Sequence, residues 1–111
     1  MAMYLAKFTH TPETWARLLA NPEDRRQTLG PVLESAGGKL HGYWYAFGDT
    51  DGYILIEAPD DLVAAGTVIR AASTGAFAKL TTTKLLTIEE TLDALRRGGG
   101  LDYRAPGAPA S

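Results

Sequence analysis

Cysteine is absent from this chain of 111 residues. Without thiols the protein cannot form disulfides, cysteine-based zinc sites, Fe–S clusters or a thiolate nucleophile. Positive charge is not in excess either, because 11 lysines and arginines stand against 13 aspartates and glutamates, for a net charge of −2. A nucleic-acid backbone is bound through excess positive charge. We therefore expect no nucleic-acid partner.

Long apolar runs are also missing. No run approaches the roughly 20 residues that cross a bilayer, and residues 1–10 lack the basic and long apolar regions of a signal peptide. We therefore expect a cytoplasmic protein with no membrane partner. The sequence contains no GxxxxGKS, GxGxxG, HExxH or GxSxG pattern. Nucleotide binding and the common hydrolase mechanisms have no support from motifs, and we expect no cofactor.

The order of apolar runs and turn signals predicts one α+β domain over residues 1–97. The expected strands are 3–8, 39–47, 53–58 and 77–86, and the expected helices are 11–35 (a pair or one bent helix), 60–74 and 88–97. Thr11-Pro12-Glu13 is typical of a helix start, and Thr87 with Glu90 forms a capping box. The order βαββαβ plus a final helix predicts a ferredoxin-like fold, with a four-stranded antiparallel sheet and helices on one face. Residues 98–111, rich in glycine, proline and alanine, are expected to form a flexible tail.

A hairpin is predicted where two aromatic and branched segments flank the Gly/Asp cluster at 48–52. A five-residue loop would place Tyr45 opposite Leu55 and Tyr43 opposite Glu57. Side chains alternate along strands, so one face would carry His41, Tyr43, Tyr45, Phe47, Tyr53, Leu55 and Glu57. Trp44 would then lie on the other face, under the helices. An open aromatic face usually marks an interface or a ligand site. We predict a homodimer joined largely through the sheets, or a higher homo-oligomer.

Three residues of this aromatic face are candidates for catalysis. Tyr43 and Glu57 would have Cβ atoms about 5 Å apart, and His41 could approach from the same strand. A buried carboxylate beside a phenol and an imidazole can have a raised pKa and can abstract a proton from a carbon acid or a phenol. The simpler interpretation is that Glu57 only accepts a hydrogen bond from Tyr43 or from a partner subunit.

A second group of polar and aromatic residues is expected around the hairpin turn: His10, Trp15, Asp49, Asp51 and Lys79. The two aspartates are more simply interpreted as turn formers, because short carboxylates bind nearby backbone. The two histidines of the chain, His10 and His41, would lie about 20 Å apart, from six residues at roughly 3.3 Å each. A metal site built from both within one subunit is therefore not expected.

Several segments resemble the GYD-domain proteins. They are GGKLHGYWYAFG at 37–48, DGY at 51–53, EAPDD at 57–61, GAF at 75–77, and LLT with EE over 85–90. The resemblance covers residues 3–97. The family's usual Gly-Glu-Tyr-Asp turn is here Gly48-Asp49-Thr50-Asp51, so the tyrosine of that turn is missing.

The resemblance implies a dimeric α+β barrel that binds or transforms a small apolar or aromatic organic molecule without a metal or nucleotide cofactor. Two cavities are open to such a ligand. Trp15 and Trp44 would line a cavity between sheet and helices, whereas Tyr43, Tyr45 and Glu57 would line one between two sheets. Tyr53 and His10 are further candidate ligand-binding residues. The alternative function is a non-catalytic ligand-binding or oligomerisation module.

Overall fold

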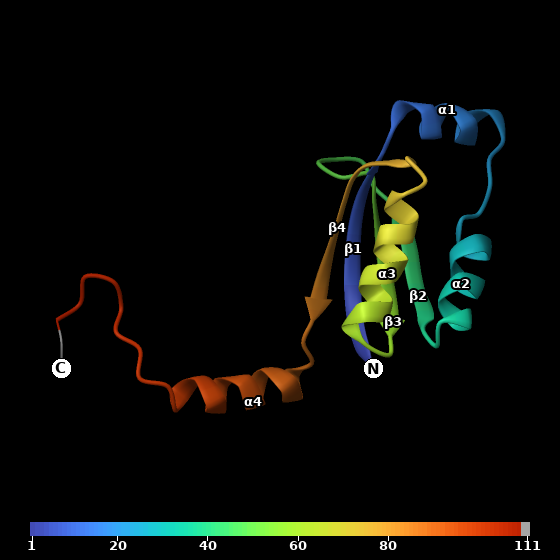
Figure 1. Ribbon diagram of the computed structural model, residues 1–111. Coiled ribbons are helices and arrows are strands. Elements are labelled where there is room, and N and C mark those ends of the chain that lie inside the picture. Colours follow the sequence, from blue (N-terminus) through green and yellow to red (C-terminus); the bar gives the residue numbers. More distant parts are fainter. Residues whose placement is uncertain (110–111) are drawn as a thin grey trace.

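The computed structural model describes residues 1–109 and contains four strands and four helices in the predicted order (Figure 1). Their bounds are β1 (Ala2–His10), α1 (Pro12–Ala20), α2 (Arg26–Ser35), β2 (Lys39–Tyr45), β3 (Gly52–Ala58), α3 (Asp61–Ala72), β4 (Phe77–Leu85) and α4 (Ile88–Gly99). Helix α4 ends two residues beyond the expected end of the domain. The last two residues of the expected tail lie outside the described residues.

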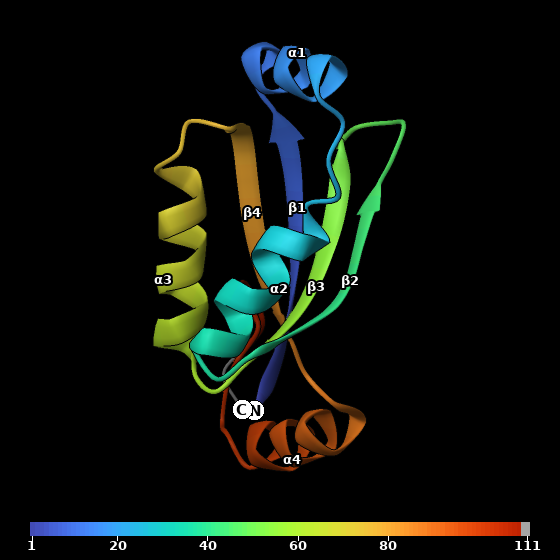
Figure 2. The ribbon, with the colours of Figure 1, turned by 90° about the vertical axis from the view of Figure 1, so that its right-hand side faces the viewer.

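The strands form one sheet in the order β2-β3-β1-β4, and each neighbouring pair is antiparallel. Helices α2 and α3 lie on the same face of this sheet, whereas α4 leaves on the other side and extends away from it (Figures 1 and 2). Helix α1 lies across the end of the sheet at which β1 finishes (Figure 2). The prediction of a ferredoxin-like α+β fold is confirmed. The sheet face opposite α2 and α3 is called the open face below.

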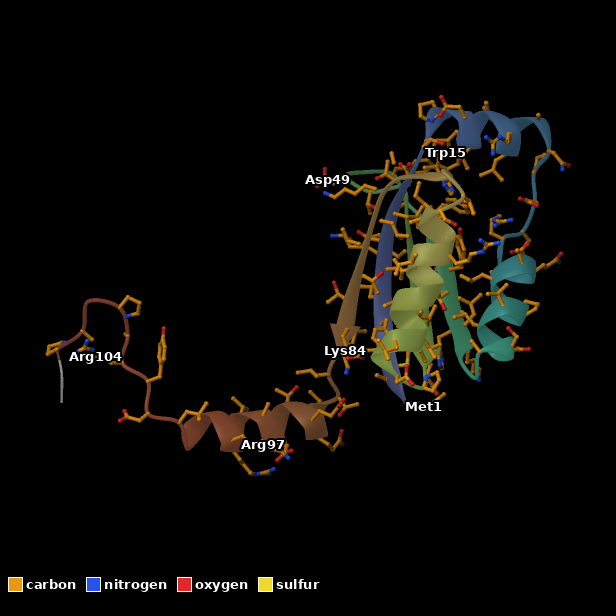
Figure 3. All side chains as sticks on the ribbon, in the orientation of Figure 1. Met1, Trp15, Asp49, Lys84, Arg97 and Arg104 are labelled. Atoms are coloured by element: carbon orange, nitrogen blue, oxygen red, sulfur yellow. The ribbon has the colours of Figure 1, made fainter. Side chains whose placement is uncertain are left out.

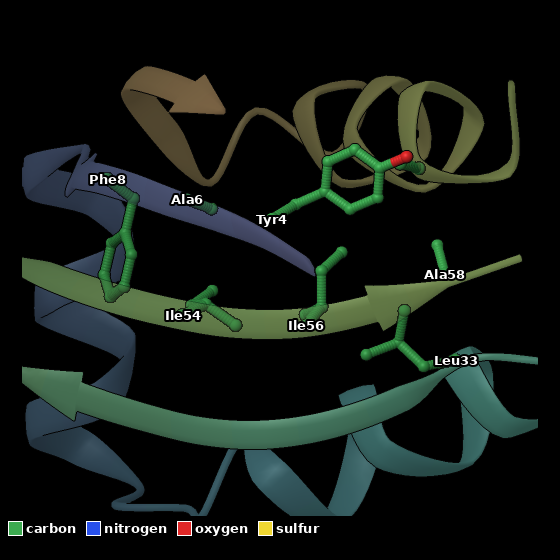
Figure 4. Close-up of a cluster of buried hydrophobic side chains, with 8 residues drawn as sticks. Tyr4, Ala6, Phe8, Leu33, Ile54, Ile56 and Ala58 are labelled. Atoms are coloured by element: carbon green, nitrogen blue, oxygen red, sulfur yellow. The ribbon is translucent and has the colours of Figure 1, made fainter. Parts of the chain in front are cut away.

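The core lies between the sheet and the helices α2 and α3 (Figure 4). Its buried members are Tyr4, Ala6 and Phe8 of β1, Ile54, Ile56 and Ala58 of β3, Leu33 of α2 and Ala64 of α3. The strand residues alternate along β1 and β3, as expected for strands with one covered face. Full burial of each large apolar side chain contributes about 1.5–3 kcal/mol, which holds the helices on this face.

Short side chains cap the first turns of three helices, two of them at the predicted residues Thr11 and Thr87. Thr11 accepts a hydrogen bond from the Thr14 amide at 3.3 Å, and Asp60 accepts one from the Val63 amide at 2.8 Å. At α4 the Thr87 hydroxyl and the Glu90 carboxylate bind each other's backbone amides at 3.0 and 2.9 Å. These bonds satisfy amides that lack a partner within the helix. The predicted region 11–35 proves to be a pair of helices, because α1 ends at Ala20 and α2 begins at Arg26.

The predicted register of the hairpin is wrong. Tyr45 pairs with Gly52 and Tyr43 with Ile54, so the loop starts earlier than expected. The Ala46 amide donates to the Asp51 carbonyl at 2.8 Å and closes this longer loop. Gly52 can enter the buried face only because it lacks a side chain, since a Cβ there would lie 2.3 Å from the Phe8 ring. An odd shift of register moves every side chain to the opposite face.

A bulge between Leu40 and Gly42 limits this reversal of faces to residues 42–45 of β2. A bulge adds one residue to a strand and so restores the original alternation beyond it. His41 therefore remains beside Glu57, as predicted, whereas Tyr43 and Tyr45 join the face that carries Phe8. Trp44 moves to the open face, where 52% of its surface is exposed.

Candidate functional site

An aromatic cluster surrounds His10, the last residue of β1. The alternation of β1 turns this side chain toward the helices, and only 5% of it is exposed. Its ring stacks on Phe77 with centroids 5.2 Å apart and meets the edge of Trp15 at 5.1 Å. The Phe8 ring lies 4.8 Å away. The sequence thus places an imidazole in largely apolar surroundings at the end of the sheet.

One nitrogen of the His10 ring is bound and the other is not. Nδ1 lies 3.2 Å from the Ala76 carbonyl oxygen. Because a carbonyl can only accept, Nδ1 must carry the proton, and Nε2 in the neutral ring presents a lone pair. Nε2 is buried without a hydrogen-bond partner within residues 1–109. Buried polar atoms are nearly always paired, so an unpaired one asks for a functional explanation.

Burial lowers the pKa of His10 below the ordinary value of 6.5. The hydrogen bond to Ala76 and the negative charge of Asp51 act in the opposite direction, and the positive charge of Arg25 acts with burial. Desolvation disfavours the charged form of a base, and here it is the largest effect. His10 is therefore neutral at pH 7, with Nε2 free to accept a hydrogen bond or a proton.

Asp51 connects the hairpin turn to this cluster. One carboxylate oxygen accepts hydrogen bonds from the His10 backbone amide at 3.0 Å and from Trp15 Nε1 at 3.1 Å. The Asp51 amide and the Thr50 hydroxyl both bind the Phe8 carbonyl at 2.8 Å. The β2–β3 loop, which carries Asp49, lies at the same end of the molecule as Trp15 (Figure 3). Asp51 therefore orients His10 and Trp15 rather than only forming a local turn.

A cavity of about 250 Å³ lies beside the histidine, and we call it the His10 cavity. It is formed by the end of β1, by α1, by the connection to α2, and by the region where α3 leads into β4. Its lining residues are His10, Thr14, Arg17, Leu18, Glu23, Arg25, Ala71, Thr74, Ala76 and Phe77. Apolar and charged groups thus meet in one hollow under α1.

Two tyrosines of β2 extend the aromatic cluster away from the cavity. The Tyr45 ring lies 5.7 Å from Trp15 and 6.1 Å from His10, and Tyr43 follows at 5.6 Å from Tyr45. Burial, and then the neighbouring Tyr45, raise the pKa of Tyr43 far above its usual range. Tyr43 therefore stays protonated and serves as an apolar wall with a hydrogen-bond donor rather than as a base.

Comparison with known families and structures agrees with this architecture. The sequence model of a family described as the GYD domain matches residues 4–95, which is most of the chain. The chain belongs to the GYD domain family. Placement in the dimeric α+β barrel superfamily is consistent with this membership. No curated protein matches the chain.

Solved structures support the fold of this GYD domain. Six chains match, and one of them is titled "crystal structure of FFRP-DM1". It is 12% identical in sequence with a TM-score of 0.51, and the match covers 78% of this chain and all of the other chain. At this identity the likeness shows a shared fold alone.

The candidate catalytic residues are only partly brought together. His41 Nε2 lies 2.9 Å from Glu57 Oε1 on the open face, so these two meet as predicted. Tyr43 lies on the opposite face of the sheet, because the register shift turns it toward Phe8. Tyr43 is therefore not placed to act together with His41 and Glu57. A catalytic role of His41 and Glu57 stays a prediction.

The candidate ligand-binding residues divide between the two faces. His10, Trp15 and Tyr45 gather in the aromatic cluster. Trp44 is on the open face and does not line the His10 cavity. Tyr53 lines a different cavity of about 290 Å³, together with Asp49, Lys79 and Lys7. The second predicted group is therefore split, since His10, Trp15 and Asp51 meet while Asp49 and Lys79 lie elsewhere.

Of the ten residues that line the cavity, only His10 was a candidate from the sequence. The missed residues include Thr14, Arg17, Arg25 and Phe77. The spacing of Thr14, Arg17 and Leu18 is i, i+3 and i+4, which places them on one face of α1. That spacing was the available signal for the first two. Nothing local marks Arg25 or Phe77, because they reach the cavity from the connection between two helices and from another strand.

Two features are absent from the described part of the chain, namely a cluster of metal ligands and a membrane-spanning helix. Within residues 1–109, no three side chains of histidine, aspartate or glutamate come together as ligands for a metal ion. None of the helices there is both long and apolar enough to span a bilayer.

Proposed function

We propose that this GYD domain binds a small aromatic or otherwise apolar organic molecule in the His10 cavity, with His10 Nε2 accepting a hydrogen bond or a proton from it. The observation that carries the proposal is the buried, unpartnered Nε2 atom of a residue that lines the cavity. An unsatisfied buried polar atom costs about 1–3 kcal/mol. A ligand hydroxyl or N–H group would remove that cost.

The neutral imidazole has a defined chemical capacity. Because Nδ1 is held by Ala76, a proton can be taken up only at Nε2. The resulting imidazolium would be stabilised by the Ala76 carbonyl and by the charge of Asp51, and opposed by burial. A weakly basic histidine of this kind accepts protons from acidic groups such as phenols or activated C–H bonds. This step uses protein groups alone and requires neither a metal nor a nucleotide.

The dimensions of the cavity limit the ligand. Pockets for drug-sized molecules enclose roughly 300–1,000 Å³, and the His10 cavity has about 250 Å³. A single substituted ring fits such a volume. Phe77 and Leu18 supply apolar lining for it. Both the catalytic and the purely ligand-binding interpretations of this family member begin with this binding step.

Filling the cavity tests the proposal. Ala71 lines the cavity from α3, so Ala71→Leu should occupy ligand space and weaken binding of phenol at least tenfold, which corresponds to about 1.4 kcal/mol. The measurement is a titration of ¹⁵N-labelled protein with millimolar phenol. The expected shift changes are at His10, Thr14 and Ala76.

The matched control is Ala72→Leu, since Ala72 is the next residue of α3, is exposed and does not line the cavity. This variant should bind phenol as the native chain does. Unchanged binding by Ala71→Leu, or shift changes confined to the open face, would contradict the proposed site.

We further propose that two copies of the GYD domain associate through their open faces. Trp44 is half exposed there, and Leu5, Tyr53 and Leu55 of the same face are incompletely buried. Helix α4, which extends away on this side of the sheet, exposes the apolar stripe Ile88, Leu92 and Leu95 (Figure 1). Contiguous apolar surface of this kind marks an interaction site.

Sedimentation equilibrium checks the association. The native chain should have the mass of two 11.9 kDa chains, and Leu55→Glu, which places a charge in the middle of the open face, should have the mass of one. Leu19→Glu is the control, because Leu19 is exposed on α1 at the end of the sheet. A native chain that sediments as a single copy at tens of micromolar would rule out this assembly.

A further inference from the structure

The charges of the residues that line the His10 cavity do not sum to zero. Its lining residues include two arginines, Arg17 and Arg25, and one glutamate, Glu23. Arg25 Nη1 pairs with Glu23 Oε1 at 3.1 Å. Arg17 forms no ion pair within residues 1–109. Since His10 is neutral at pH 7, one positive charge of the lining remains without compensation.

We propose that the ligand of the His10 cavity carries a carboxylate, which the Arg17 guanidinium binds while the ring of the ligand packs against Phe77. The inference rests on the proposed function and adds the chemical class of the ligand, an aromatic monocarboxylate. A planar guanidinium presents paired N–H donors that match the two oxygens of a carboxylate. The cavity offers such a donor beside an apolar wall.

The placement of Arg17 favours a ligand over a purely local role. Arg17 lies in the last turn of α1, where its charge also suits the helix dipole. The interaction with the helix dipole does not depend on the side of the helix from which the arginine projects. Arg17 nevertheless shares its face with Thr14 and Leu18, and all three line the cavity.

The positive charge of Arg25 acts at the buried end of the cavity, near His10. Its charge acts with burial to lower the pKa of His10, and it partly opposes the rise in the pKa of Tyr43. Because Glu23 already pairs with Arg25, that guanidinium has less capacity for a ligand anion. Arg17 is therefore the assigned carboxylate-binding residue, and Arg25 adds long-range attraction to the same anion.

The test compares 4-hydroxybenzoate with 4-hydroxybenzamide, a neutral molecule of nearly the same shape. Both keep a phenol hydroxyl that can donate to His10 Nε2, so they differ in the carboxylate. The chain has two tryptophans, so a Trp44→Phe background leaves Trp15, next to His10, as the single fluorescent reporter. In this background 4-hydroxybenzoate is expected to bind about tenfold or more tightly than 4-hydroxybenzamide at low ionic strength. Arg17→Gln should remove the difference, and Arg17→Lys should keep part of it.

The control is Arg96→Gln on α4, which removes an arginine that does not line the cavity and should leave the tenfold preference unchanged. Equal binding of the hydroxybenzoate and the hydroxybenzamide, both lost in Ala71→Leu, would overturn the carboxylate inference and leave the proposed function standing. A preference for the hydroxybenzoate that persists in Arg17→Gln would overturn the assignment to Arg17. Absence of binding by both compounds, checked by the His10 amide shift, would overturn the proposed function and the inference together.

Discussion

Replacement of Phe8 by alanine is expected to lower the free energy of unfolding by about 3–5 kcal/mol. Phe8 is 1% exposed and is one of the largest fully buried side chains of the core. Its ring has edge contacts with Phe77, Tyr43 and Tyr45 at centroid distances of 5.5–5.8 Å. Removal of the ring leaves a void that these neighbours cannot fill without giving up their own contacts. The loss therefore includes both the burial of the ring and the cost of the cavity.

Urea denaturation followed by circular dichroism measures this effect. Phe47→Ala is the matched control, because it is the same substitution at a fully exposed residue of the β2–β3 loop. Surface substitutions of this kind usually change stability by no more than about 0.5 kcal/mol. A loss below about 1 kcal/mol for Phe8→Ala would show that the core is not organised around this ring.

Replacement of Asp51 by alanine is expected to cost about 2–4 kcal/mol of stability and to disturb the aromatic cluster. The substitution removes two hydrogen bonds to a carboxylate, of which each contributes about 1.5–3 kcal/mol where it is shielded from water. It also leaves the backbone amide of the buried His10 without its acceptor. Because Trp15 loses its bond as well, its fluorescence emission should shift.

Two variants separate the role of Asp51 from a general effect on the turn. Asp49→Ala changes the same residue type in the same loop, and the Asp49 side chain forms no hydrogen bond within residues 1–109. This variant should be as stable as the native chain. Asp51→Asn keeps an acceptor of the same shape and should lose less than half as much as Asp51→Ala. Equal stability of Asp51→Ala and Asp49→Ala would show that the bonds to His10 and Trp15 contribute little.

Local signals were sufficient for most of the fold. Capping residues such as Thr11, Asp60 and Thr87 mark helix starts because their side chains bind amides within the next three residues. The alternation of β1 and β3 shows which side chains face the helices. Both kinds of signal act over a few residues, so they can be recognised without knowledge of the rest of the molecule.

The candidate site was recovered only in part, for a geometric reason. His41 and Glu57 were predicted together and lie together, because the bulge after Leu40 restores the original alternation at that end of β2. Beyond the bulge the prediction for Tyr43 and Trp44 is reversed. A bulge and a loop length are each a matter of one or a few residues, yet either reverses the face of every side chain that follows.

The order of the elements, the ferredoxin-like fold and the family could all be read from the sequence, as could the gathering of His10, Trp15 and Asp51 near the turn. The burial of His10 with one bound and one free nitrogen, and the cavity that it shares with Arg17, Arg25 and Phe77, become visible only in the folded chain. Those facts depend on segments far apart in the chain, since Ala76 and Phe77 meet His10 through the pairing of β4 with β1. Burial and the pKa shift that follows from it are properties of that packing, and no local pattern of residues encodes them.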